Sequence, residues 1–233
     1  MNYYLAAAYR KNGQPAEAKK VYDAILGLKP EEKDAYFLRG SAELELGDYE
    51  SAKADFDKAI SMDPKNYDRL IEIYEALADY GYREVGQEYL QNVLNTDKKL
   101  DAYDSGRIYY YLGDYQKAYL ALEEAKGKGG VDSYLYLGKA YAATGDYNYA
   151  SSVYSNYLSK QGPDAEIYNQ LGLCELAKKD YQKALEAFQA GKQIEGNSLM
   201  QTLSFNEIVA YEYLQDYQKA AVLLKAYLQN YPD

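Results

Sequence analysis

One short landmark recurs along the whole chain and limits the folds that the chain can adopt. Leu-Gly-Asp-Tyr occupies residues 46–49 and 112–115, and Thr-Gly-Asp-Tyr occupies residues 144–147. Weaker copies lie around Gly13, Gly81, Lys179 and Gln215, so that successive copies are 34, 34, 32, 32, 34 and 36 residues apart. Each copy separates two amphipathic runs, and glycine suits the left-handed cap between two helices. The landmark therefore predicts seven helix–turn–helix units.

Further positions recur in phase with this landmark. The fifth copy is the clearest and has Tyr134, Leu137, Gly138, Tyr141, Ala150 and Tyr154 in register. This combination resembles the tetratricopeptide repeat family, and the resemblance covers essentially the whole chain. It implies an all-α fold, a right-handed α-solenoid of seven stacked hairpins that forms one superhelical domain over residues 1–233. The hairpins are expected at approximately 1–32, 33–66, 67–98, 99–130, 131–164, 165–200 and 201–233.

Small residues occupy two fixed slots of most units. The first helix carries Gly40, Gly106, Gly138 and Gly172, and the second carries Ala52, Ala118, Ala150 and Ala184. Glycine inside a helix costs about 0.5–1 kcal/mol relative to alanine, so its recurrence predicts that the two helices approach closely. The third copy departs from this pattern, because Tyr74 and Gly86 stand in its two small slots. Its assignment depends on the good copies on either side.

The charge of the chain narrows the class of partner. The formal net charge is −10, and no block of basic residues is present. Nucleic-acid binding needs clustered Lys and Arg, so no nucleic-acid partner is expected, and anionic membrane surfaces are disfavoured for the same reason. No apolar run is long enough to span a bilayer, so we expect no membrane insertion of this chain. A basic or neutral protein fits best.

The residues needed for most catalytic sites are scarce. Histidine is absent, which removes the usual general base near neutral pH and the commonest metal ligand. Cys174 is the one cysteine, and it lies in an apolar helical run where a buried structural thiol is expected. No loop resembles a phosphate or calcium site. We therefore expect no enzyme activity, no cofactor and no metal.

In the resembled family, the first helix of each hairpin lines a concave surface that binds extended peptides or partner helices. The corresponding slots imply a partner-binding groove of Tyr103, Arg107, Tyr110, Tyr136, Lys139, Asn169, Gln170 and Leu173. The last hairpin adds Phe205, Asn206, Val209 and Tyr213. The N-terminal half offers a possible acidic groove of Asp34, Glu45, Asp68, Glu72, Glu75 and Asp79. Arg107 and Lys139 share one slot in adjacent copies and are flanked by tyrosines, a combination typical of interface hot spots.

These patterns favour a scaffold that binds a peptide or protein segment, possibly a basic one, in the concave groove. One alternative is a module for a glycan or another small ligand, since 15 of the 31 tyrosines lie outside the repeat slots and could stack on a ligand. Another is a structural solenoid that self-associates through uncapped ends, at residues 2–4 and 231–233. The sequence leaves the compartment open: cytoplasmic, or extracytoplasmic if an N-terminal signal has been removed.

Overall fold

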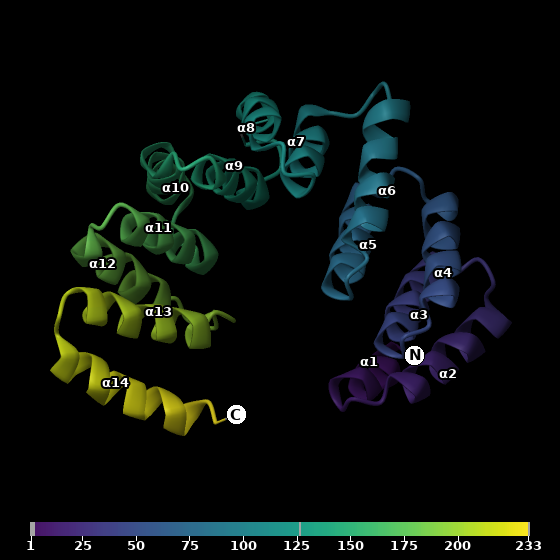
Figure 1. Cartoon of the computed structure of the whole chain (residues 1–233), viewed down its shortest axis with the longest axis horizontal. Helices are drawn as coiled ribbons and strands as arrows, with labels where there is room; N and C mark the ends of the chain where they lie inside the picture. Colours follow the sequence, from purple (N-terminus) through teal and green to yellow (C-terminus); the bar gives the residue numbers. More distant parts are fainter. Residues whose placement is uncertain (1–2, 126, 233) are drawn as a thin grey trace. The chain divides into compact units, whose positions relative to one another are not determined.

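The computed structural model of the chain describes residues 3–125 and 127–232 (Figure 1). Within these ranges it contains fourteen α-helices and no β-strand. Consecutive helices pair into seven hairpins, which confirms the predicted all-α repeat. Asn2, Lys126 and Asp233, which belong to the expected chain ends and to the loop of residues 126–130, lie outside the described residues.

The chain divides into two compact units, residues 1–100 and residues 101–233. The helices of the first unit are α1 (Tyr3–Lys11), α2 (Pro15–Leu28), α3 (Lys33–Glu45), α4 (Tyr49–Met62), α5 (Tyr67–Asp79) and α6 (Arg83–Thr96). The helices of the second unit are α7 (Ala102–Tyr111), α8 (Tyr115–Glu124), α9 (Val131–Ala143), α10 (Tyr147–Gln161), α11 (Ala165–Ala177), α12 (Tyr181–Lys192), α13 (Met200–Tyr213) and α14 (Tyr217–Asn230). The expectation of a single superhelix over both units stays a prediction.

The recurring landmark forms the tight turn inside each hairpin. The backbone is left-handed at all seven landmark slots, which are Gly13 (φ 67°), Gly47 (78°), Gly81 (87°), Gly113 (81°), Gly145 (85°), Lys179 (63°) and Gln215 (64°). The aspartate after the slot caps the second helix: Asp216 accepts a hydrogen bond from the backbone N–H of Lys219 at 3.0 Å. Asp48, Asp114 and Asp180 make the same contact in their own hairpins. The landmark is therefore a helix stop followed by a helix start.

The first-helix glycines make room for a large side chain of the second helix. A Cβ atom added to Gly138 would lie 2.2 Å from Cζ of Tyr154, and one added to Gly172 would lie 2.3 Å from Cε1 of Phe188. Both aromatic side chains are fully buried. The alanine slot lies beside this contact, because a Cβ on Gly40 would also lie 3.1 Å from the carbonyl oxygen of Ala52. The close approach predicted from the glycines is confirmed, and a ring or a leucine occupies the space.

The third hairpin, α5 and α6, makes a comparable close contact with the glycine on its second helix. Its first helix carries the large residue Tyr74, and its second helix carries Gly86. A Cβ on Gly86 would lie 2.9 Å from Cδ2 of Tyr74. A large residue in the first small slot is therefore matched by glycine in the second, while buried Leu90 keeps the slot of Phe56, and the segment is a true hairpin.

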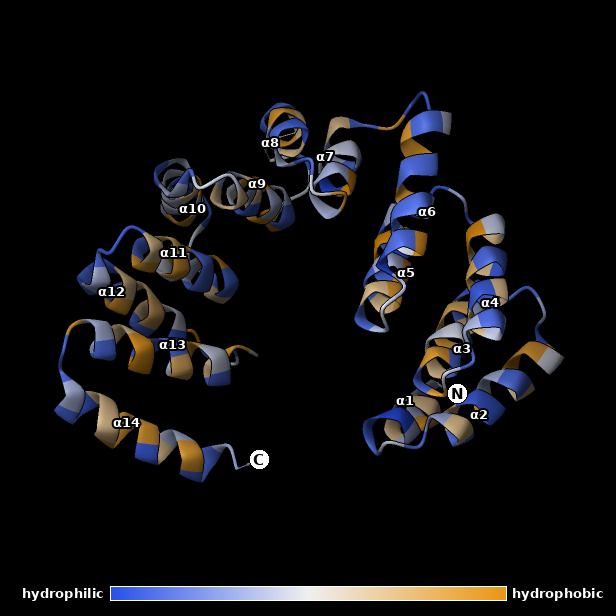
Figure 2. Cartoon of the chain, viewed as in Figure 1, coloured by the Kyte–Doolittle hydropathy of each residue, from blue (hydrophilic) through white to orange (hydrophobic). Residues whose placement is uncertain are grey.

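Each unit has its own buried apolar clusters. The first unit buries Phe56, Ile73 and Leu77 together, and the second buries Leu122, Leu137, Tyr154 and Ile167 together. Figure 2 shows how hydrophobic and hydrophilic residues alternate around helices such as α14, as expected for amphipathic helices. Among the described residues, no helix combines the length and the apolar character that crossing a bilayer requires.

Candidate partner-binding surface

The first helices of the second unit form a row that we call the first-helix face: α7, α9, α11 and α13. Polar contacts join each helix to the next along this row. The hydroxyl groups of Tyr111 and Tyr136 lie 3.0 Å apart between α7 and α9. Nζ of Lys139 lies 3.7 Å from Glu166 between α9 and α11, and Asn206 of α13 donates to Asn169 of α11 at 2.8 Å. The four first helices therefore follow one another in one continuous row.

Four tyrosines cluster at the α7 end of this face. The ring centroid of Tyr110 lies 5.4 Å from that of Tyr111, 5.7 Å from that of Tyr115 and 5.6 Å from that of Tyr136. Edge-to-face and tilted geometries dominate, as aromatic quadrupoles favour. All four side chains are half-buried, so the cluster presents ring edges and hydroxyl groups at the surface while it braces α7 against α9.

Arg107 lies deeper than its slot suggested. Only 6% of the residue is exposed. Its guanidinium lies 4.4 Å from the ring centroid of Tyr103, and it forms an ion pair with Asp104. The other side of Tyr103 meets the loop before α9, because a Cβ on Gly129 would lie 2.4 Å from that ring. Tyr103 and Arg107 are thus largely packed into the protein, and the Arg107 charge is balanced locally.

The centre of the face carries paired polar groups. The side chain of Lys139 is about one-third exposed, and its partner Glu166 also accepts a hydrogen bond from Gln170 at 2.8 Å. Asn169 is 5% exposed and accepts from Asn206. Lys139 supplies positive charge here. The carboxylate of Glu166, which was not among the predicted groove residues, balances this charge.

Large apolar side chains are exposed at the α11 and α13 end. Leu173 is 39% exposed, Phe205 48% and Tyr213 56%. Tyr213 stacks on Tyr181 with ring centroids 4.9 Å apart, which fixes its orientation. Exposed rings and aliphatic groups side by side mark interaction surfaces more often than isolated ones do. Leu173 was predicted as a groove residue, and Phe205 and Tyr213 were expected from the last hairpin.

The acidic residues predicted in the first unit are partly neutralised. Arg69 forms ion pairs with Asp34 at 2.8 Å and with Glu72 at 2.9 Å, and its guanidinium lies 4.0 Å from the ring centroid of Phe37. Arg10 forms an ion pair with Glu45. Asp68, Glu75 and Asp79 are exposed. The surface that the sequence described as acidic is therefore a mixed one.

Sequence reasoning missed three charged residues of these surfaces: Arg10, Arg69 and Glu166. Arg69 directly follows Asp68, and Glu166 occupies the slot that Asp34 and Asp68 hold in their own copies, so the repeat register contained part of the signal. Glu166 lies three residues before Asn169, which places it one turn earlier on the same side of α11. A search for opposite charges in neighbouring copies at offsets of about 27 to 35 residues would have found these pairs.

The described residues contain no group of three or more Cys, Asp or Glu that could hold a metal ion. Cys174 is 4% exposed, and burial raises the pKa of its thiol to about 12. A thiol with such a pKa stays protonated at neutral pH and is a poor nucleophile. The first-helix face offers aromatic and aliphatic contact, hydrogen bonds and the ion pair of Lys139 with Glu166.

Seven helical hairpins with the same left-handed turn define a helical repeat protein. Models of the family described as "Tetratricopeptide repeat" match residues 3–67, 135–198 and 205–233. The chain belongs to the tetratricopeptide repeat family.

Curated relatives share parts or the whole of this repeat region. Tetratricopeptide repeat protein 21B of Xenopus laevis is 27% identical over 98% of this chain and 15% of its own length. A mouse (Mus musculus) FK506-binding protein-like protein is 42% identical over 27% of this chain and 18% of its own length. The chain therefore spans less than a fifth of either relative.

Solved structures share the fold at low sequence identity. A tetratricopeptide repeat protein from Parabacteroides merdae has a TM-score of 0.60 and 16% identity, covering 89% of this chain and 82% of that one. Yeast Tom70 has a TM-score of 0.64 and 17% identity, covering 93% of this chain and 48% of that one. The Cut9–Hcn1 hetero-tetramer of the APC/C has a TM-score of 0.54 and 18% identity, covering 88% of this chain and 41% of that one. These likenesses support the helical repeat fold.

Proposed function

We propose that this chain is a protein-interaction scaffold whose first-helix face binds a segment of another protein, without catalysing a reaction. The observation that carries the proposal is the exposure of Leu173, Phe205 and Tyr213 on neighbouring first helices. Interface energy is concentrated in a few apolar and aromatic anchors that lose their contact with water on binding. These three residues supply anchors of that kind on a rigid helical framework.

Polar groups beside the anchors would orient the bound segment. Lys139, Glu166 and Gln170 lie between the tyrosine cluster and Leu173, and each retains hydrogen-bonding capacity beyond its intramolecular contact. Tyr110 and Tyr136 would contribute ring edges and hydroxyl groups, with Tyr103 and Arg107 supporting them from beneath. A segment that crosses the face would meet aromatic, ionic and apolar groups in that order.

The charge of the chain favours a basic or neutral partner. The net charge of −10 gives long-range attraction to cationic segments. In the first unit, the exposed carboxylates of Asp68 and Asp79 would add to this attraction. Among the similar structures, Cut9 is found in a hetero-tetramer with Hcn1. A protein with a comparable fold thus assembles with another protein.

The proposal can be tested with a displayed library of random peptide segments selected on the wild-type protein. The selected peptides are then measured against a Leu173→Glu, Phe205→Glu double variant, which places two charges among the anchors. Val222→Glu, Leu228→Glu is the matched control, because these side chains of α14 are 63% and 58% exposed. We expect about a tenfold or greater loss of affinity in the first variant and none in the control. Peptides that bind both variants as well as wild type, or a selection that yields no binder, would contradict the proposal.

A further inference from the structure

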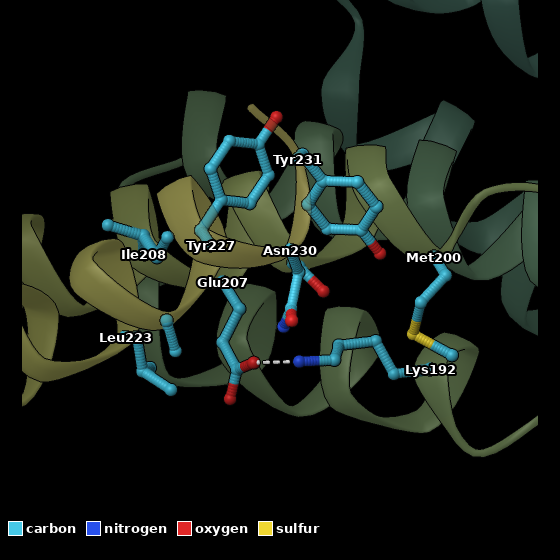
Figure 3. Close-up of a pocket in the computed structure, with 10 residues that line it drawn as sticks. Lys192, Met200, Glu207, Ile208, Leu223, Tyr227, Asn230 and Tyr231 are labelled. Carbon is cyan, nitrogen blue, oxygen red and sulfur yellow. Dashed lines mark hydrogen bonds and ion pairs between the residues drawn. The ribbon is translucent and has the colours of Figure 1, made fainter. Parts of the chain in front are cut away.

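A recess lies between α12, α13 and α14. It has a volume of about 260 Å³ (Figure 3). Ile208 and Leu223 lie together at one end, and Met200 lies beside Lys192 at the other (Figure 3). Glu207 and Asn230 lie between the two ends. The rings of Tyr227 and Tyr231 border it. Repeat packing requires the seam between α13 and α14, but it does not require a recess with both apolar and polar lining.

Hydrogen bonds hold the polar groups of the recess in place. Glu207 is 6% exposed, and its carboxylate accepts from Nζ of Lys192 at 2.6 Å and from Nε2 of Gln189 at 2.8 Å. A carboxylate offers about four lone-pair sites and an ammonium three N–H groups, so both groups can bond a ligand in addition. Their opposite charges cancel within the recess. A neutral ligand with several hydroxyl or amide groups suits these polar groups, whereas a net charge on the ligand gains little.

The recess also offers flat and aliphatic surfaces. The ring centroids of Tyr227 and Tyr231 lie 5.0 Å apart with an angle of 49° between the planes. The ring centroid of Phe205, an exposed residue of the first-helix face, lies 5.8 Å from that of Tyr227. Met200 is 38% exposed at the rim, whereas Ile208 is 3% exposed. A phenol ring can stack on the C–H face of a saturated ring, and the thioether of Met200 can receive a methyl group.

We propose that this recess binds an acetamido sugar, a neutral pyranose ring that carries an N-acetyl group. The sugar would stack on Tyr231 and direct its hydroxyl groups to Glu207 and Asn230. Its acetamide carbonyl would accept from Lys192, and its methyl group would lie against Met200, which lies beside Lys192 (Figure 3). A free sugar and the terminal residue of a glycan share this chemistry.

The test is a titration of the isotope-labelled protein, followed by amide chemical shifts. The probe is N-acetylglucosamine, with glucose as the comparator that lacks the acetamide. Ala226→Phe fills the recess from an exposed position that lines it, and Ala221→Phe places the same ring elsewhere on α14. We expect saturable shifts confined to α12, α13 and α14 with the acetamido sugar, abolished by Ala226→Phe and retained in Ala221→Phe.

Further variants separate this site from the first-helix face. Tyr231→Ala should weaken binding about tenfold through loss of stacking, and Leu173→Glu should leave it unchanged. N-acetylated disaccharides decide between a free sugar and a glycan end, since tighter binding of the longer probe indicates the glycan. Equal response to glucose, shifts outside these helices, unchanged binding in Ala226→Phe, or no saturable shift would each overturn the proposal.

Discussion

At the scale of single residues, the turn slot of each hairpin is the position with the strictest demand. Lys179 and Gln215 hold the same left-handed conformation as the glycines of the other copies, with φ of 63° and 64°. A side chain in this region costs roughly 1–2 kcal/mol, which glycine avoids. The last two hairpins therefore keep the turn geometry at a local cost, and surrounding contacts maintain it.

Replacing Gln215 by glycine should stabilise the protein. We expect a gain of about 1 kcal/mol in the free energy of unfolding, because the strain disappears while the turn is kept. The matched control is Glu212→Gly, an exposed residue within α13, where glycine should cost about 0.5–1 kcal/mol. Denaturant titration measures both. A loss of stability in Gln215→Gly would show that the left-handed residue is not strained.

Two buried glutamates replace tyrosine in the first helices of the second and sixth hairpins. Glu43 is 3% exposed and lies 3.3 Å from Nζ of Lys19, and Glu175 is 5% exposed and lies 2.8 Å from Nζ of Lys178. Burial, followed by the neighbouring charge of Asp55, raises the pKa of Glu43 above its usual 4.5. Ionised Glu43 is therefore less favourable in the folded chain than in the unfolded one.

The sign of the pH effect follows from this shift. The neutral form of Glu43 favours the folded state below about pH 4.5, and this contribution is lost as pH rises through the raised pKa. Glu43→Gln cannot ionise, so it should match wild type at about pH 4 and melt at a higher temperature at about pH 7. Exposed Glu50→Gln is the control. A variant that is less stable than wild type at neutral pH would mean that the Lys19 ion pair outweighs burial.

At the scale of helices, stability depends on how closely the two helices of a hairpin approach. Second-helix Tyr154 and Phe188 fill the space that first-helix Gly138 and Gly172 leave open. The third hairpin reaches a comparable fit with Tyr74 on the first helix and Gly86 on the second. In the second to sixth hairpins, a glycine on one helix therefore lies against a large side chain of the other helix.

Gly138→Ala should destabilise the fifth hairpin by about 1–3 kcal/mol, because its Cβ would overlap the buried ring of Tyr154. Gly27→Ala is the matched control. It also lies inside a helix, but its Cβ would meet nothing within 4 Å, so alanine should stabilise by about 0.5–1 kcal/mol. Opposite changes in the denaturation midpoint are the expected result, and equal changes would contradict the packing argument.

At the scale of the whole molecule, residues 1–100 and 101–233 each contain their own buried clusters. In repeat proteins, stability is approximately the sum of local hairpin stabilities and nearest-neighbour terms. Local opening should then spread among adjacent hairpins before it reaches distant ones.

Amide hydrogen exchange can test this expectation. Gly138→Ala should accelerate exchange in α9 and α10 and leave α3 and α4 at wild-type rates, since those helices belong to the other unit. Gly27→Ala provides the reference for an unrelated substitution. Uniform acceleration over all helices would instead indicate that the chain opens as one cooperative body.

The sequence by itself determined the hairpins. Their turns, caps and seams depend on contacts between residues less than about 35 positions apart, and the 32- to 36-residue period repeats those requirements seven times. It also indicated which helices carry Leu173, Phe205 and Tyr213, because the repeat register fixes the side of each first helix. These features follow from local geometry and from composition.

Only the tertiary structure decided how the candidate surfaces are charged and filled. Arg107 looked like an accessible cation but packs on Tyr103, and Asp34 looked like a single acid but pairs with Arg69. The recess beside Glu207 has no sequence signature. The physical reason is the same in each case: burial and ion pairing depend on which rotamers meet between neighbouring helices, and the repeat period does not specify them.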